Sequence, residues 1–191
     1  MRVSLWLCGT RVEFEGLEHL ADARNVVVMP NHTSHLDAPI LVGLLPVEAK
    51  AVLKRELYRF PLVHYCTRFA GFVDVDRRDP GGAKRAIDQA AASLRAGHCF
   101  VIFPEGTRSR SGELGPFKKG AFVAAIEASS RIVPVAIRGA YELLAPGSFR
   151  VKPGTVRVKV LDPVPAGGYS YEDRDRLAAE VRGRIAAALG G

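Results

Sequence analysis

The sequence predicts a single α/β domain over residues 1–191, in which helices flank a largely parallel or mixed central sheet. Short apolar segments alternate with amphipathic stretches along the chain. Strands that alternate with helices are typical of layered α/β domains. A length of 191 residues suits one domain with its own core. The sequence contains no internal repeat, low-complexity tract or linker that would divide it.

The predicted strands are short and apolar. Residues 26–29 read VVVM, a β-branched run typical of a buried strand. Pro134 interrupts another apolar run, IVPVAI, and proline cannot donate a hydrogen bond within a sheet, so we expect an edge strand or a bulge there. The remaining strands are expected at residues 49–54, 72–75, 99–103 and 155–161.

The predicted helices follow the strands. The clearest is an amphipathic stretch in which Ala83, Ile87, Ala90 and Leu94 recur at helical spacing, and Gly97 ends it. The other helices are expected at residues 38–46, 117–129 and 173–189.

Composition indicates a cytoplasmic protein without an export signal. The longest apolar run, Ala38 to Val47, has ten residues and two prolines, too few to span a bilayer. The first residues lack the cleavage pattern of a signal peptide. The three cysteines are odd in number and lack CxxC spacing, so we expect neither a disulfide framework nor a zinc site.

The net charge of +7 is concentrated in the middle of the chain, where residues 50–138 hold 16 basic and 8 acidic side chains. Such a bias attracts phosphate groups on nucleic acids, lipid headgroups or a nucleotide-bearing cofactor. We do not expect nucleic acid, because only 8% of residues are aromatic and none are interleaved with the basic clusters.

The segment NHTSHLD, residues 31–37, follows the strand predicted at 26–29. Open α/β sheets build their sites at the carboxyl ends of strands. His32 could act as a base near pH 7, and Asp37 could hold its far ring nitrogen. A spacing of five does not suit one helix face, so we expect His32 in the loop and Asp37 in the first helical turn.

Two other interpretations of this segment stay open. His35 completes a His-x-x-His-x-Asp pattern that suggests a metal site, although no second His or Cys cluster follows downstream. His32 could alternatively cap the helix that comes after it. We expect no metal.

The segment FPEGTRS, residues 103–109, follows the apolar run predicted as a strand at 99–103. We expect Glu105, Gly106, Thr107 and Arg108 to project together from the turn. Glycine allows the backbone to approach a ligand closely, threonine adds a hydroxyl donor, and arginine binds phosphate in a fork. Taken alone, the segment could also be a turn with a surface arginine.

Two further cations stand at predicted strand ends. Lys54 ends AKAVLK, and Arg77 ends GFVDVDR. A solvated lysine and a strand-end salt bridge are the alternatives at these two places.

Together these segments resemble the glycerolipid acyltransferases, a family with a signature of His, four residues and Asp. NHTSHLD, GFVDVDR, FPEGTRS and IVPVAI occur in the family's order, and LKREL around Lys54 is similar to its lysine block. The resemblance covers roughly residues 10–140. It departs at Asp74, where the family usually has an aromatic residue. Many relatives also carry an N-terminal hydrophobic anchor, whereas His32 stands early in this chain.

The resemblance implies a glycerolphosphate-acyltransferase-like fold and acyl transfer from acyl-CoA or acyl carrier protein to a lysophospholipid, chiefly 1-acylglycerol-3-phosphate. It assigns catalysis to His32 and Asp37, and phosphate binding to Arg77 and Arg108 with help from Lys54. Glu105, Gly106 and Thr107 would shape the acceptor site. No cofactor is implied beyond the acyl thioester.

Other acceptors remain open, among them glycerol-3-phosphate and other hydroxylated lipids. So does a module of a different class that binds phosphate or membrane without chemistry. To act on lipid, the chain would bind peripherally to the cytoplasmic face of the membrane through basic and apolar surface.

Overall fold

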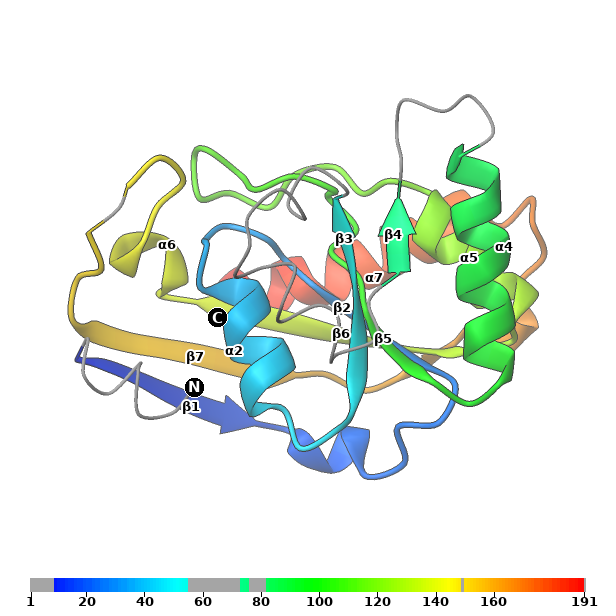
Figure 1. Cartoon of the computed structure of the whole chain (residues 1–191), viewed down its shortest axis with the longest axis horizontal. Helices are drawn as coiled ribbons and strands as arrows, with labels where there is room; N and C mark the ends of the chain where they lie inside the picture. Colours follow the sequence, from blue (N-terminus) through cyan, green and yellow to red (C-terminus); the bar gives the residue numbers. More distant parts are fainter. Residues whose placement is uncertain (1–8, 55–72, 76–81, 149, 191) are drawn as a thin grey trace.

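The computed structural model describes residues 9–54, 73–75, 82–148 and 150–190, and it has a mixed sheet with helices on both faces (Figure 1). In the described residues the sheet has eight strands, seven of them in the order β1-β7-β6-β2-β5-β3-β4, while β8 pairs with β6 beside this path. This architecture confirms the α/β fold class expected from the sequence.

The strands are β1 (Thr10–Glu15), β2 (Val26–Pro30), β3 (Ala49–Lys54), β4 (Val73–Val75), β5 (Cys99–Val101), β6 (Arg131–Arg138), β7 (Gly154–Val160) and β8 (Val164–Pro165). The α-helices are α2 (Asp37–Leu44), α4 (Gly82–Arg95), α5 (Gly120–Glu127), α6 (Ala140–Leu143) and α7 (Arg174–Gly190). Two short 3₁₀ helices are η1 (Leu17–Leu20) and η3 (Ala166–Gly168).

The middle of the sheet is parallel. β2 pairs in parallel with β5 on one side and with β6 on the other, and β3 and β4 continue the parallel run beyond β5. The carboxyl ends of these strands therefore meet at one edge of the sheet, where open α/β folds place their sites.

Alternate residues of the strands enter two separate cores, as the period of two in a strand requires. Val26 and Val28 of β2 pack in the core that contains α2, α6 and β7. Val27 and Met29 pack in the other core, with α4, α5 and α7. Figure 1 shows α2 in front of the sheet and α7 behind it. Because β2 is buried on both faces, it reads as a continuous apolar run.

Pro134 does not mark an edge strand, contrary to the expectation from the sequence. β6 lies inside the sheet, next to β2, and is antiparallel to β7 and β8 on its other side. β8 pairs with Arg131 and Ile132, and β7 pairs from Val135 onward. Pro134 falls in the gap between these two pairings, so its missing N–H costs no ladder bond on that side.

Most predicted elements are present with ends shifted by a few residues, but β1 was missed. Its sequence, TRVEFE, carries charges on one face. Two of those charges form ion pairs with the neighbouring strand β7. Arg157 Nε lies 3.3 Å from Glu13 Oε2, and Lys159 Nζ lies 2.7 Å from Glu15 Oε1. No helix in the described ranges has the length and apolar character needed to cross a membrane.

Candidate active site

His32 lies in a loop at the carboxyl end of β2, and Asp37 is the first residue of α2. This is the arrangement expected from their spacing of five. His32 Nδ1 is 2.9 Å from Asp37 Oδ2. The same carboxylate oxygen accepts hydrogen bonds of 2.7 Å from the backbone N–H groups of Thr33 and Ser34. Asp37 is fully buried, so the loop and the helix start together hold its carboxylate in place.

Besides the contact of Nδ1 with Asp37, the flat face of the His32 imidazole also has a partner. Its ring stacks on the ring of Phe103, with centroids 3.9 Å apart and planes inclined by 28°. The side chain remains 18% exposed, so a substrate can reach it. Asp37 accepts a hydrogen bond only from a protonated Nδ1, which makes Nε2 the basic nitrogen of the neutral ring.

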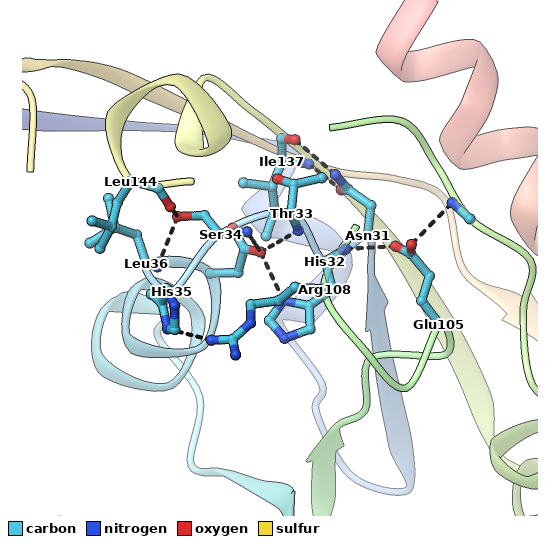
Figure 2. A network of polar contacts seen from close by, with 12 residues as sticks. Asn31, His32, Thr33, Ser34, His35, Leu36, Glu105, Arg108, Ile137 and Leu144 are labelled. Atoms are coloured by element: carbon cyan, nitrogen blue, oxygen red, sulfur yellow. Dashed lines mark hydrogen bonds and ion pairs between the residues drawn. The ribbon is translucent and has the colours of Figure 1, made fainter. Parts of the chain in front are cut away.

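Two polar side chains next to His32 anchor the loop to the rest of the fold (Figure 2). Asn31 bonds through its amide to both backbone groups of Ile137 in β6. Ser34 Oγ donates to the carbonyl of Leu144 at 2.7 Å. Asn31 and Ser34 are buried, and sequence reasoning assigned them no role. A polar residue directly after a buried strand was the available signal for Asn31.

Glu105 is buried behind His32 rather than exposed in the turn. One carboxylate oxygen accepts the backbone N–H of His32 at 2.7 Å, and the other accepts that of Gly115 at 3.0 Å. Figure 2 shows the Glu105 carboxylate directed toward the loop that carries His32. Burial raises the pKa of Glu105 above its usual range, and the two N–H donors oppose that rise.

Arg108 reaches in another direction, toward His35, and its guanidinium contacts His35 Nδ1 (Figure 2). Partial desolvation lowers the pKa of His35, and the positive charge of Arg108 lowers it further. A neutral His35 can accept the hydrogen bond that Arg108 donates. Arg108 is therefore held at the rim of the loop, on the side chain of the second histidine in NHTSHLD.

The four residues expected to project together from FPEGTRS are thus separated. Glu105 points into the fold and Arg108 points toward His35, whereas Thr107 is exposed. Gly106 has φ of +69°, a conformation that favours glycine. A Cβ at this position would approach the side chain of Lys118 to 3.0 Å.

The two other predicted cations are placed less fully. Lys54 is the last residue of β3, and its backbone pairs with Val75 of β4. It therefore stands at the carboxyl end of the parallel run. Arg77 lies outside the described residues, as do the other residues of GFVDVDR except Val73, Asp74 and Val75.

A cavity of about 490 Å³ adjoins the loop, with Asn31 and Thr33 in its wall. The remaining wall comes from residues 112–114, from the join of β6 and α6, and from the end of α7. His32 is not part of this wall, so the cavity meets the loop away from the imidazole.

A metal site at His32 and His35 was the alternative interpretation, but one ring nitrogen of each histidine already contacts another side chain. His32 Nδ1 is bonded to Asp37, and His35 Nδ1 contacts Arg108. Within the ranges that the structure covers, no group of three or more His, Cys, Asp or Glu side chains is placed to hold a metal ion.

A histidine oriented by a buried carboxylate, at the carboxyl edge of a parallel sheet, is the arrangement expected of an enzyme that uses histidine as a base. The family model described as Acyltransferase matches residues 11–138. This chain belongs to the acyltransferase family, which confirms the resemblance seen in its motifs.

Relatives and a solved structure agree with this assignment. The chain is 34% identical to human 1-acyl-sn-glycerol-3-phosphate acyltransferase alpha, over 93% of this chain and 63% of that protein. It is 31% identical to the 1-acyl-sn-glycerol-3-phosphate acyltransferase of Limnanthes douglasii, over 90% of this chain and 60% of that protein. It therefore spans about three fifths of the length of these curated relatives.

The crystal structure of PlsC, the 1-acyl-sn-glycerophosphate (LPA) acyltransferase from Thermotoga maritima, resembles this chain with a TM-score of 0.84. The two sequences are 31% identical, and the match covers 96% of this chain and 73% of the other. The sheet and its flanking helices are thus those of this family.

Proposed function

We propose that this protein transfers a fatty acyl group from an acyl thioester to the free hydroxyl of 1-acylglycerol-3-phosphate, giving phosphatidic acid. The observation that carries the proposal is the contact of 2.9 Å between His32 Nδ1 and the buried Asp37. The human and plant relatives and PlsC are named as acyltransferases of this acceptor, which supports the choice.

His32 is the general base of the proposed reaction. Its Nε2 takes the proton of the acceptor hydroxyl while the hydroxyl oxygen attacks the thioester carbonyl carbon. The carbon–sulfur bond then breaks, and the departing thiolate recovers the proton from His32 as a thiol. Asp37 keeps the ring in the correct tautomer and stabilises the imidazolium that forms. No covalent acyl-enzyme and no cofactor beyond the thioester are needed.

Arg108 supplies the proposed contact with the acceptor's phosphate. Its guanidinium is fixed near the loop by His35, and a fixed guanidinium can bind two phosphate oxygens at once. Lys54, at the carboxyl end of β3, and Arg77 would add positive charge. Gly106 and Thr107 stand in the turn next to Arg108 and would contribute backbone and hydroxyl donors to the same acceptor site.

The proposed donor is acyl-CoA or acyl carrier protein, and the proposed location is the cytoplasmic face of the membrane. The excess of basic residues between 50 and 138 supports peripheral binding to anionic lipid. Vesicles of anionic lipid should sediment the protein at low salt, and vesicles of zwitterionic lipid should not. Equal sedimentation with both would contradict electrostatic binding.

The direct test measures thiol release from acyl-CoA in the presence of 1-acylglycerol-3-phosphate. His32→Ala should lower the rate by about 10²–10⁴-fold, the contribution typical of a positioned base. His98→Ala is the matched control, because His98 is exposed just before the amino end of β5. The mass of the lipid product identifies the acceptor. Equal rates for His32→Ala and the wild-type protein would refute the role of His32.

A further inference from the structure

The backbone of His32 is bound on both sides by the loop that follows β5. Its N–H donates to Glu105 at 2.7 Å, and its carbonyl accepts the N–H of Ser109 at 2.8 Å. These two partners are only four residues apart, so one short segment holds the peptide groups on either side of the His32 Cα. Displacing that segment would displace the imidazole.

Both oxygens of the Glu105 carboxylate are engaged inside the fold. Each of its oxygens accepts one backbone N–H, and the residue is only 5% exposed. A buried carboxylate requires such donors, because burying an unpaired charge is costly. A negative charge is also a poor partner for a phosphate-bearing acceptor, which it would repel.

The far end of this link depends on a glycine. A Cβ built on Gly115 would lie 2.8 Å from Glu105 Oε2. That is closer than van der Waals contact allows, so any larger residue at 115 would displace the carboxylate. The absence of a side chain at Gly115 therefore lets its backbone N–H approach Glu105. Two hydrogen bonds link His32 to Glu105 and Glu105 to Gly115.

We propose that Glu105 is a positioning residue, which acts on catalysis through the backbone of His32 and does not contact the acceptor. The proposal rests on the acyl transfer proposed above. It replaces a role for the Glu105 side chain in the acceptor site. A base must meet its proton in close geometry, and a misplacement of about 1 Å can cost on the order of 10²-fold in rate.

Two variants break the link from opposite ends. Glu105→Gln keeps the shape, but its single carbonyl oxygen can accept only one of the two N–H groups, and its NH₂ group faces the other. Gly115→Ala leaves Glu105 in the sequence and pushes its carboxylate away. Glu127→Gln is the matched control, since Glu127 is an exposed residue at the end of α5.

In steady-state acyl transfer, both link variants should lower kcat by about 10–10²-fold, with the acceptor KM within about twofold of wild type, as expected for lost positioning and not lost binding. Glu127→Gln should match the wild-type protein. A raised acceptor KM with kcat unchanged would mean that Glu105 contacts the acceptor, and it would overturn the proposal.

NMR tests the link without any substrate. The His32 amide proton should resonate far downfield in the wild-type protein, because its acceptor is a carboxylate, and it should move upfield in Glu105→Gln and Gly115→Ala. An unmoved His32 amide would overturn the proposal even if kcat fell. If the wild-type protein transfers no acyl group, the proposed function fails. If it does, and both variants keep its kcat, only the positioning role fails.

Discussion

Asn31 pairs with Ile137 as though β2 were one residue longer. Its side-chain nitrogen donates to the Ile137 carbonyl at 3.0 Å, and its side-chain oxygen accepts the Ile137 N–H at 2.7 Å. The Asn31 side chain thus satisfies the backbone groups of Ile137 in β6 at the point where the backbone of β2 leaves the sheet. The chain is free to turn at His32 while the neighbouring strand keeps its hydrogen bonds.

Asn31→Ala should destabilise the protein by about 1–3 kcal/mol, because it leaves a buried N–H and a buried carbonyl of Ile137 without partners. Asn31→Asp should be destabilising too, since a carboxylate can accept from Ile137 but cannot donate to it. Urea unfolding followed by circular dichroism measures both. Wild-type stability in Asn31→Ala would contradict this account of the loop anchor.

Asp37→Asn should leave the fold in place and lower kcat by about 10²-fold or more, because a neutral amide no longer stabilises the imidazolium of His32. The amide oxygen can still accept the N–H groups of Thr33 and Ser34, so the start of α2 should persist. Circular dichroism confirms folding before the rate of thiol release is measured. Asp175→Asn, on the surface of α7, is the control. Wild-type kcat in Asp37→Asn would show that Asp37 does not act on the base.

His35 should titrate below its ordinary pKa of 6.5, because partial desolvation and the charge of Arg108 both disfavour its protonated form. Arg108→Gln removes the second cause and should raise the pKa of His35 toward 6.5. Arg110→Gln, at an exposed position two residues away, should leave it unchanged. NMR titration of the ring protons gives the values. An unchanged His35 pKa in Arg108→Gln would contradict their contact.

Glu105 should make the unfolding free energy depend on pH. Burial raises the pKa of Glu105 in the folded protein above its ordinary value of 4.5, so between those two pKa values the folded state holds more protons than the unfolded state. The stability contributed by this group then falls as pH rises through that window. Urea unfolding of the wild-type protein and of Glu105→Gln across this range gives both unfolding free energies. As pH rises, the unfolding free energy of the wild-type protein should fall relative to that of the variant. A parallel pH dependence would contradict the raised pKa.

Cys99 should be unreactive in the folded protein. It is 3% exposed in β5, and burial raises the pKa of its thiol to about 12, so almost no thiolate is present near pH 8. Alkylation with iodoacetamide followed by peptide mapping should label Cys99 only after denaturation. Labelling in the native protein at the denatured rate would contradict its burial.

Local patterns in the sequence predicted the parts of this molecule that depend on local geometry. The apolar run at 26–29 predicted β2, and the spacing of His32 and Asp37 predicted a loop followed by a helical turn. Both are read from residues close together in the chain. Pro134 was expected in an edge strand or at a bulge, and the edge position was wrong, because its missing donor is accommodated between two neighbouring strands that the run itself does not reveal.

Contacts with backbone groups far along the chain were beyond prediction. A glutamate followed by glycine, threonine and arginine suggested a cluster facing a ligand, but Glu105 binds the amide of His32, 73 positions away. Backbone amides are the same in every residue, so no residue type marks such a partner. β1 was missed for a similar reason, since its charges make sense only beside the basic residues of β7.

The hydrogen bonds around His32 differ greatly in the length of chain that they close. His32 and Asp37 are five residues apart, whereas the bonds that place them join residues separated by 73 and 106 positions. Short loops close early and long ones late during folding. His32 and Asp37 can therefore meet as soon as α2 begins to form, but their final position is set only after β5 and β6 have docked on β2. During refolding, the circular dichroism signal of the helices should therefore recover first. Activity should recover later, when the sheet is complete.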